Sequence, residues 1–386
     1  VSDRGLMGPG PGNPYPEVMS ALSRPLLGHL DPEFIALLDE TCDRLRQVFR
    51  TTNPLTFPVS GTGSAGMEAT VVNMVGPGDT IVIGVNGVFG GRLCDAAGRT
   101  GAEVIRVDAE WGHTLNPELL LQAHPSPKVI AVVHAETSTG VCNDLEDLGA
   151  GKGDALLLVD AVTSLGGIPT DFDAWGVDVA YSGTQKCLGT PPGLSPVTVS
   201  PRALERAVPK SPSWYFDFEA IAAYVTGGGA RAYHHTAPIS MIFALHAGLG
   251  AVLEEGLDAV IVRHKTCGDL LKEGLLERGF TLFAQEGYRL PQLTSVVVPQ
   301  DRLPAGQDEA AVRRLLLDRY DIEIGGGLGP VAGQVWRIGT MGYNSRKQNV
   351  LMCLAALEAT LRQEGFAAKP GAAVDEALAV YRKAGQ

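Results

Sequence analysis

Lys186 and Asp160 are residues of complementary chemistry that each follow an apolar, strand-like run. Lys186 closes the segment YSGTQK at residues 181–186, and Asp160 closes the run LLLVD at residues 156–160. A lysine amine can hold the aldehyde of pyridoxal phosphate as a Schiff base, and a carboxylate at the ring nitrogen keeps the pyridine protonated, so that it accepts electrons. The pair predicts one cofactor site with two catalytic residues. Taken singly, such an aspartate is more often a turn former and such a lysine more often solvated.

A glycine-rich segment, GTGSAGME at residues 61–68, follows another strand-like run and opens a helix-like stretch. The free N–H groups at the start of a helix, together with the hydroxyls of Thr62 and Ser64, can bind a phosphate. The segment lacks the terminal Lys-Ser/Thr of a Walker A loop, and it does not match the dinucleotide-binding motif in a convincing context. A glycine-rich helix cap without a ligand explains this segment alone equally well.

Two further residues are candidates for contacts with a ring and with an anion. Phe89, in the glycine-flanked turn NGVFGGR at residues 86–92, could stack on a planar ring, although a core aromatic fits the pattern equally well. Arg337 lies inside the apolar run VWRIG at residues 335–339, where a guanidinium needs an anion. A substrate α-carboxylate would provide it through a bidentate pair, and a salt bridge with a protein carboxylate is the alternative.

The histidines of the sequence do not indicate a metal site. In YHHT at residues 233–236 the two histidines are adjacent, which is not the usual spacing of zinc ligands, and no acidic cluster accompanies them. The hydroxyls of Tyr233 and Thr236 are better candidates for hydrogen bonds to a phosphate. His134 has the side chain of a general base, but we expect it to pack against the cofactor or a strand end, because the lysine is the better placed proton carrier.

A parallel sheet is the element that could bring these residues together. Residues 55–200 alternate β-branched runs, glycine-rich turns and helix-like segments, which is typical of a doubly wound α/β domain. Apolar runs such as VIAVV at 129–133 indicate strands covered on both faces. Ligands of such sheets bind beyond the carboxyl ends of the strands, where Asp160, Thr137 and Lys186 fall. The predicted strands are 55–60, 80–85, 103–108, 129–135, 155–162, 179–184 and 196–200.

The rest of the chain predicts an arm and a second domain. Residues 240–278 have a helical pattern that favours one long helix or two. Beyond it, a helix-like segment at 309–320 lies between strand-like runs at 292–299 and 335–339, which indicates a smaller α+β domain. GPGPGNPYP at residues 8–16 cannot form a regular helix. The predicted units are an N-terminal arm at 1–20, a large cofactor-binding domain at 21–258 and a small C-terminal domain at 259–386.

Composition favours a cytoplasmic enzyme with small substrates. The chain has 386 residues, of which 45% are apolar and 19% charged, so it is too apolar to be disordered and too long for one small core. Its net charge of -12 argues against nucleic acid or an anionic membrane as partner. The six cysteines form no Cys-x-x-Cys pair, which indicates a reducing compartment. No signal-peptide core and no membrane-spanning apolar stretch is present, so we expect no membrane partner.

Together, eight segments resemble the class V aminotransferases of fold type I, and most closely the alanine-glyoxylate and serine-pyruvate aminotransferase group. The segments are GPGP at 8–11, GTGS at 61–64, NGVFG at 86–90, ETSTG at 136–140, VDAVTS at 159–164, SGTQK at 182–186, YHHT at 233–236 and RIG at 337–339. The resemblance covers nearly the whole chain. It implies an α/β fold with a mostly parallel seven-stranded sheet in the large domain and a smaller α+β domain at the C-terminus.

The resemblance also implies a role for each candidate residue. Lys186 would bind the cofactor aldehyde, Asp160 the ring nitrogen and Thr137 the phenolic oxygen, while Val162 would pack beneath the ring. Phe89 stands where eukaryotic members of the group have tryptophan, so stacking would survive with less area. The residues implied at the phosphate are Thr62, Gly63, Ser64 and Gln185, with Tyr233 and Thr236 of the neighbouring subunit.

The implied active unit is therefore a homodimer with shared sites. Arg337 would bind the substrate carboxylate, and the turn at Pro9 and Gly10 would line the substrate pocket. A second departure from the family is the run of glycines at 149, 151 and 153, which predicts a short or irregular crossover, because glycine weakens a helix interior.

The reaction that this resemblance implies is ping-pong transfer of an amino group from alanine or serine to glyoxylate or pyruvate. Alternatives on the same scaffold are pyridoxamine-pyruvate transamination, ureidoglycine-glyoxylate transamination and a β-lyase. A cysteine desulfurase is disfavoured, because Cys267 and Cys353 fall in helix-like segments instead of a mobile loop. A non-catalytic homologue is disfavoured by the intact lysine, aspartate and arginine.

Overall fold

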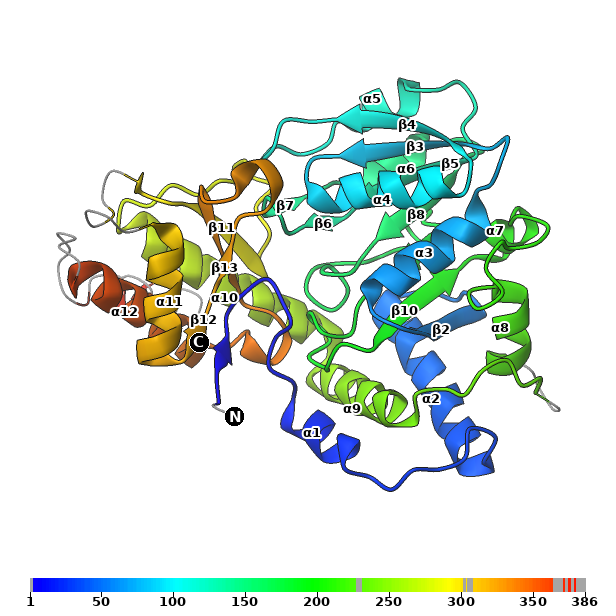
Figure 1. Ribbon diagram of the computed structural model, residues 1–386, viewed down its shortest axis with the longest axis horizontal. Coiled ribbons are helices and arrows are strands. Elements are labelled where there is room, and N and C mark those ends of the chain that lie inside the picture. The colour runs from blue at the N-terminus through cyan, green and yellow to red at the C-terminus, as the bar shows by residue number, and fades with distance from the viewer. Residues whose placement is uncertain are drawn as a thin grey trace.

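A computed structural model describes residues 3–226, 231–300, 303, 308–363, 371, 374–375 and 378–379 of the chain. It has a larger region built around a sheet and a smaller region that holds the C-terminal part of the chain, yellow to orange-red in Figure 1. The first residues of the chain, in blue, lie beside the smaller region (Figure 1).

The sheet of the larger region confirms the predicted architecture. Its strands are β2 Leu55–Ser60, β3 Thr80–Val85, β4 Glu103–Asp108, β5 Val129–Val133, β8 Leu156–Asp160, β9 Val179–Tyr181 and β10 Leu194–Val199. Their spatial order is β2-β10-β9-β8-β5-β3-β4. Neighbouring strands are parallel except at β10, which is antiparallel to both β2 and β9. The sheet is therefore seven-stranded and mostly parallel.

The register of three central strands aligns their carboxyl ends. Val133 of β5 is paired with Asp160 of β8, and Asp160 is paired with Tyr181 of β9. Every residue of these strands is buried, as expected for apolar runs covered on both faces. The polar residues that follow the strands consequently meet at one edge of the sheet.

Three predicted strands are longer than the observed ones. The run at 129–135 is divided after Val133, because the next residues form β6 Ala135–Glu136, which pairs with β7 Val141–Cys142 in a separate hairpin. The run at 155–162 ends at Asp160 and the run at 179–184 ends at Tyr181. The chain turns away at each point, which releases the polar residues from the sheet.

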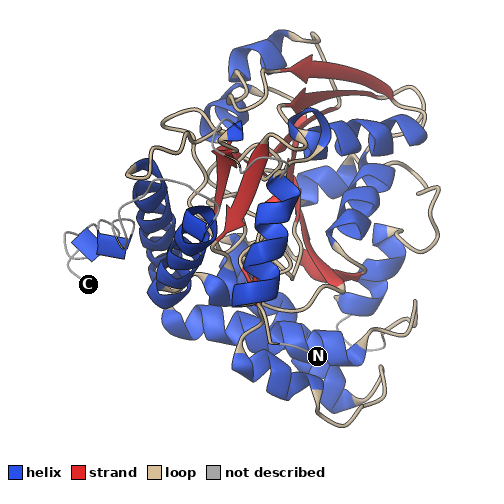
Figure 2. Ribbon diagram, turned by 60° about the vertical axis from the view of Figure 1, so that its left-hand side comes forward, coloured by secondary structure: helices blue, strands red, loops and turns tan. Residues whose placement is uncertain are grey.

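Helices flank the large sheet (Figure 2). The helices of the larger region are α1 Pro16–Leu22, α2 Pro32–Phe49, α3 Gly63–Met74, α4 Val88–Arg99, α5 Pro117–Gln122, α6 Glu146–Gly151, α7 Pro201–Glu205, α8 Phe218–Val225 and α9 Ile239–Glu255. α3 packs on β9 and β10, and α4 packs on β3 and β4. The glycine-rich crossover predicted to be short is the six-residue helix α6.

Local signals account for several helix ends. Asp31 caps α2 by accepting a hydrogen bond from the N–H of Glu33, and Pro32 occupies the first helical position, where no donor is needed. Residues 240–278, for which one long helix or two were predicted, lie in two helices, α9 and α10, Leu257–Leu276. They are separated at Gly256, whose φ is 91°. A glycine adopts this conformation without strain.

The smaller region has its own sheet and apolar cluster. Its sheet is antiparallel, with the order β11-β14-β13, and α10 and α11 pack against α12. Its elements after α10 are β11 Leu293–Val297, α11 Glu309–Tyr320, β12 Ile322–Glu323, β13 Gly325–Gly326, the 3-10 helices η2 Gly329–Val331 and η3 Gly342–Asn344, β14 Val335–Gly339 and α12 Lys347–Gln363. The arm contributes β1, Gly5–Leu6, which pairs with β12, and Met7, which belongs to the same apolar cluster. The division at residue 258 stays a prediction.

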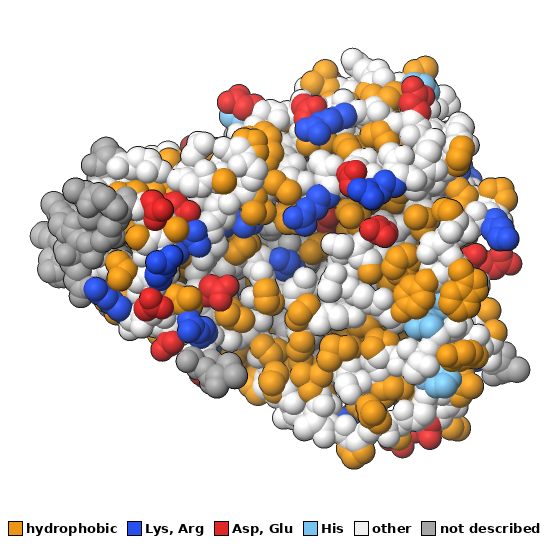
Figure 3. Space-filling model, viewed as in Figure 1, with side chains coloured by type: hydrophobic (Ala, Val, Ile, Leu, Met, Phe, Trp, Pro, Cys, Tyr) orange, Lys and Arg blue, Asp and Glu red, His pale blue; other side chains and the backbone are white. Residues whose placement is uncertain are grey.

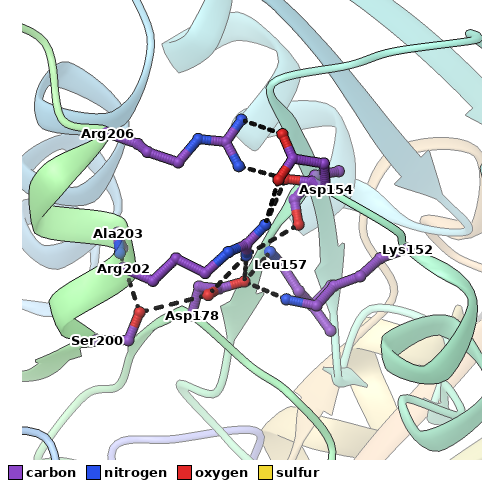
Figure 4. A network of polar contacts seen from close by, with 9 residues as sticks. Lys152, Asp154, Leu157, Asp178, Ser200, Arg202, Ala203 and Arg206 are labelled. Carbon is purple, nitrogen blue, oxygen red and sulfur yellow. Dashed lines mark hydrogen bonds and ion pairs between the residues drawn. The ribbon is translucent and has the colours of Figure 1, made fainter.

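Figure 4 shows a polar network around Asp178. It lies at the amino ends of β8 and β9, whereas Asp160 lies at the carboxyl end of β8. Asp178 is only 5% exposed, and its carboxylate accepts hydrogen bonds from Leu157 N at 2.9 Å and Arg202 Nη1 at 3.0 Å, as well as from Lys152 Nζ. It therefore joins β8, β9 and the start of α7. No helix of the described residues is long and apolar enough to span a membrane.

Candidate active site

The carboxyl edge of the sheet opens into a cavity of about 240 Å³. The side chains that line it come from α3, α4, the ends of β5, β8 and β9, and the loops that follow them. They are Thr62, Gly63, Ser64, Met67, Phe89, Arg92, Val133, Ala135, Thr137, Asp160, Val162, Thr163, Tyr181, Gln185 and Lys186. Figure 3 shows basic side chains beside the furrow between the two regions. Nine residues predicted at the cofactor thus line one cavity.

Asp160 is a buried carboxylate at the end of β8. Its Oδ1 accepts a hydrogen bond from Val162 N at 2.9 Å, and its Oδ2 accepts one from the hydroxyl of Tyr181 at 2.8 Å. Burial raises the pKa of Asp160 to about 6, because the charged form loses its hydration. A cation beside this carboxylate would offset the energetic cost of burying its charge. The sequence pattern assigned no role to Tyr181, because its position opposite Asp160 depends on the register of the sheet.

Lys186 lies in the loop after β9 and reaches toward the arm. Its Nζ donates a hydrogen bond to the carbonyl oxygen of Pro9. Burial lowers the pKa of Lys186 to about 8, so that a larger fraction of the amine is neutral and nucleophilic near neutral pH. The next residue of the arm, Gly10, has a φ of 103° and leaves space for the lysine side chain. The structure thus brings Lys186, Asp160 and Gly10 into one region, as the sequence predicts.

The start of α3 is suited to an anion. Thr62 is the N-cap residue, but its side chain makes no capping hydrogen bond, so its hydroxyl is available. A Cβ added at Gly63 would lie 3.0 Å from Cγ2 of Val162, and this close approach brings the helix start against the loop after β8. Gln185 and Ser64 line the same cavity. Helix N–H groups and hydroxyls therefore converge there.

Phe89 belongs to the start of α4 and not to the turn that the sequence suggested. The helix begins at Val88, one residue earlier, after the N-cap Gly87. The guanidinium of Arg92, one helical turn further on, lies 5.1 Å from the centre of the Phe89 ring. Arg92 was not predicted, although a spacing of three residues from Phe89 on a helix could have indicated it.

Arg337 is a buried cation on β14, with 6% of its surface exposed. Its Nε donates to the carbonyl oxygen of Gly326 at 2.7 Å, and its Nη1 donates to that of Thr137 at 3.4 Å. Burial lowers the pKa of Arg337 to about 10. No carboxylate of the described residues forms an ion pair with it, so the salt bridge considered from the sequence is not observed. The Arg337 guanidinium is therefore available to pair with the carboxylate of a substrate.

Tyr233 and Thr236 do not line this cavity. The side chain of Tyr233 is 59% exposed, and its hydroxyl lies 3.2 Å from Oγ1 of Thr236. His234, in the same segment, stacks on Trp214 with ring centres 4.7 Å apart. Among the residues with assigned positions, no group of three or more histidine, cysteine, aspartate and glutamate side chains could hold a metal ion.

His134 packs away from the cavity. Its ring meets Trp175 edge to face at 5.8 Å, and burial lowers its pKa to about 3. A neutral, enclosed imidazole of this kind is a packing residue and not a base in contact with substrate. The backbone N–H of His134 donates to the carbonyl oxygen of Asp160, at the end of β8, at 3.0 Å.

These features fit pyridoxal phosphate: a buried carboxylate with an elevated pKa, a lysine with a lowered one, an open helix start and an aromatic ring surround one cavity. The fold and the site define a pyridoxal-phosphate-dependent transaminase of fold type I. The family model "Aminotransferase class-V" matches residues 14–348. The chain belongs to the class V aminotransferase family.

Individual relatives cover almost the whole chain. An alanine-glyoxylate aminotransferase of Drosophila melanogaster is 38% identical over 96% of this chain and 95% of its own. The crystal structure of alanine-glyoxylate aminotransferase from Nostoc sp. has a TM-score of 0.89 and 48% identity, covering 94% of this chain and 96% of its own. That of ureidoglycine-glyoxylate aminotransferase from Bacillus subtilis has a TM-score of 0.94 and 38% identity, with 99% of each chain covered.

Proposed function

We propose that this aminotransferase moves the amino group of a small L-amino acid, alanine or serine, to glyoxylate or pyruvate by a ping-pong mechanism. The observation that carries the proposal is Arg337, a buried guanidinium without an ion-paired carboxylate among the described residues. Its Nη1 contacts the carbonyl of Thr137, which lines the cavity with Lys186. The likeness to alanine-glyoxylate aminotransferases supports the choice of small substrates.

The substrate end of the site is formed by Arg337 and the arm. Arg337 binds the α-carboxylate through two parallel N–H donors, which fixes the α-carbon near Lys186. Gly10 lines the pocket on the side of the lysine amine. Orientation by a bidentate pair is what allows one lysine to act on one particular C–H bond.

Lys186 and Asp160 carry out the proton chemistry. Bound pyridoxal phosphate supplies an aldehyde that takes up the amino group and a ring that accepts electrons. Asp160 would keep a proton on the ring nitrogen, and Thr137 would hydrogen-bond the phenolic oxygen. Lys186 Nζ would be the base that takes the α-proton of the amino acid and the acid that returns a proton. In the second half of the cycle, the same amine moves the proton in the opposite direction.

The cofactor is held by its ring and its phosphate. Phe89 and Val162, which line the same cavity, would hold the ring by stacking and packing. The phosphate accepts hydrogen bonds from the start of α3. The residues assigned to the phosphate are Thr62, Gly63, Ser64 and Gln185.

Tyr233 and Thr236 complete the phosphate site of a second copy of the chain in a homodimer. Their exposed position outside the cavity of their own chain supports this assignment. Tyr233→Phe should weaken cofactor binding in the dimer, and a mixed dimer with Lys186→Ala in the other copy should retain one intact site. Sedimentation together with activity of the mixed dimer tests the shared site; a monomer with full activity would refute it.

A cytoplasmic location completes the proposal. All six cysteines are free thiols, as in a reducing compartment. Fractionation of the source cells tests the location.

A second candidate reaction on the same scaffold is transfer from ureidoglycine to glyoxylate, which is favoured by the likeness to the Bacillus subtilis enzyme. Pyridoxamine-pyruvate transamination and a β-lyase reaction are two further candidates. The two transaminations differ from the proposed reaction in the amino donor, whereas a β-lyase would eliminate a β-substituent and leave the cofactor in its aldehyde form.

The near-visible absorption spectrum separates these functions. We would reconstitute the protein with pyridoxal phosphate, add L-alanine and then glyoxylate, and repeat the experiment with L-serine, ureidoglycine and pyridoxamine. A band that alanine bleaches and glyoxylate restores supports the proposal. A band that responds only to a different donor selects the reaction of that donor. The Lys186→Ala variant should lack the band, and wild-type turnover by this variant would refute the role of Lys186.

A further inference from the structure

Glu136 is an enclosed acid beside the cofactor site, and the proposed function does not use it. It follows Ala135 at the end of β6, and none of its surface is exposed. Its Oε2 accepts hydrogen bonds from the N–H groups of Phe89 at 3.0 Å and Gly90 at 3.2 Å. Its Oε1 accepts bonds from N of Ser138 at 3.0 Å and from its Oγ at 2.6 Å.

The donors that surround Glu136 favour its ionised form. Ser138 Oγ accepts the N–H of Val88 at 2.9 Å, so the hydroxyl proton is free to be donated to Glu136. Both oxygens of Glu136 then receive only donors, which a carboxylate accepts and a carboxylic acid would satisfy less well. Burial nevertheless raises the pKa of Glu136 above its usual value, with the hydrogen bonds opposing that change.

Glu136 and Ser138 together satisfy the first three amides of α4. These amides belong to Val88, Phe89 and Gly90, and they have no partner within the helix itself. A Cβ at Gly87 would clash with the Glu136 side chain, so the helix start sits directly against the carboxylate. The start of α4 is thereby occupied by protein groups, whereas the N-cap side chain of α3 makes no capping bond.

The same carboxylate is next in sequence to Thr137. The turn that bears Thr137 is held through its neighbours on both sides, Glu136 and Ser138, and the Thr137 carbonyl receives Arg337 Nη1. Burial lowers the pKa of Arg337, and the charge of Glu136 opposes part of that change by favouring the protonated guanidinium. One buried acid therefore links three groups around the cavity.

We propose that Glu136 is a positioning residue for the cofactor ring: it fixes the aromatic side chain of Phe89 relative to Thr137, so that the two meet the ring in one geometry. This inference rests on the ring contacts proposed above for Phe89 and Thr137. The competing interpretation is a helix cap that only stabilises the fold, as buried caps do in many proteins.

Glu136→Gln tests the proposal with little change in volume. The amide nitrogen is a donor where the carboxylate oxygen was an acceptor. It would face an N–H or O–H group of Phe89, Gly90 or Ser138, and one of these hydrogen bonds would be lost. Ser138→Ala is the second variant; it removes one link and keeps the acid. Asp178→Asn is the control, because Asp178 is a buried acid that directly precedes β9, at the end of the strand opposite to Tyr181 and the cavity.

The measurements are the dissociation constant of pyridoxal phosphate, the position of the near-visible band of the bound cofactor, and the melting temperature without cofactor. We expect the dissociation constant to rise about tenfold in Glu136→Gln and less in Ser138→Ala, with a shifted band in both. We expect Asp178→Asn to melt at a lower temperature but to bind the cofactor as the wild type does.

An unchanged dissociation constant and band in both variants would overturn the proposal, even if their melting temperatures fall. If Glu136→Gln does not fold, Ser138→Ala decides between the two interpretations by the same two measurements. Failure of the wild-type protein to take up the cofactor would refute the proposed function itself, and is therefore distinguishable from failure of the positioning role.

Discussion

Gly10 of the N-terminal arm lies directly against the side chain of Lys186: a Cβ atom at residue 10 would fall 2.5 Å from the lysine Nζ. The preceding carbonyl, that of Pro9, accepts a hydrogen bond from the same nitrogen. Gly12 N donates to the carbonyl of Gln185 at 3.1 Å, so the arm is attached to the lysine loop on both sides of this contact. The arm therefore forms one wall around the lysine amine.

Gly10→Ala should impair cofactor uptake. The new methyl group would displace Lys186, and the φ of 103° at residue 10 is strained for alanine by about 1 kcal/mol. We expect the rate of uptake to fall at least about tenfold, measured by the growth of the near-visible band. Gly12→Ala is the matched control, because the nearest atom to its Cβ, Met341 O, is 3.5 Å away. Equal rates in both variants would contradict a role of the arm at the lysine.

The rate of cofactor uptake should rise with pH and level off near pH 8. The neutral amine of Lys186 is the nucleophile, and burial lowers its pKa from 10.5 to about 8. Below that pH, the neutral fraction grows about tenfold per pH unit, and above it the amine is already neutral. Stopped-flow absorbance measures this profile. A rate that keeps rising up to pH 10 would show that the lysine titrates at its ordinary value.

Asp160→Asn should stabilise the protein without cofactor and weaken its binding of cofactor. Burial raises the pKa of Asp160 from 3.8 to about 6, so the ionised group destabilises the fold increasingly as pH rises through this interval. At pH 7 an uncharged amide removes this cost, and we expect a gain of about 1 to 3 kcal/mol in the free energy of unfolding.

Denaturant unfolding at pH 4 and pH 7 checks the stability, and the gain should be confined to the higher pH. The variant should also lose turnover by about 10² or more, because the ring nitrogen loses its anion. If the Asp160→Asn variant were less stable than the wild type at pH 7, the ionised Asp160 would not destabilise the fold as proposed.

Arg337→Lys should reduce kcat/KM for the amino donor by about 10- to 100-fold, which corresponds to roughly 1.5 to 3 kcal/mol. Lysine keeps the positive charge but cannot present two parallel donors to a carboxylate. Cofactor binding should change little. Arg313→Lys serves as the control, since Arg313 is already paired with Glu309 at 2.7 Å. Steady-state kinetics measure this difference. An equal reduction of kcat/KM in both variants would argue against carboxylate binding by Arg337.

Asp178→Ala should lower the free energy of unfolding by about 3 kcal/mol or more without affecting the active site. Removing this carboxylate leaves Lys152 and the N–H of Leu157 without a buried partner. Asp154→Ala is the control, because the Asp154 side chain is 94% exposed and its ion pairs with arginine are solvated. Thermal unfolding measures the difference. Similar melting temperatures in the two variants would show that the network is not stabilising.

The sequence determined the elements and the order of the chemical groups. The runs that became β2, β3 and β4 have the predicted ends, because short segments rich in β-branched residues between Gly, Pro and Asn turn residues favour strands. Lys186, Asp160 and the glycine-rich start of α3 were recognisable for a similar reason: each follows a strand, and the ends of parallel strands share one edge of a sheet.

Tertiary structure decided which of these groups touch. Tyr181 meets Asp160 because β8 and β9 have one particular register, and the Pro9 carbonyl meets Lys186 because the arm returns to the sheet after pairing with β12. Packing between distant segments also decided whether Arg337 forms an ion pair with a protein carboxylate. The same holds for the capping of α4 by Glu136. Hydrophobic pattern and residue type are local properties of a chain, whereas these contacts join residues far apart in sequence, and only the packed fold fixes their distances.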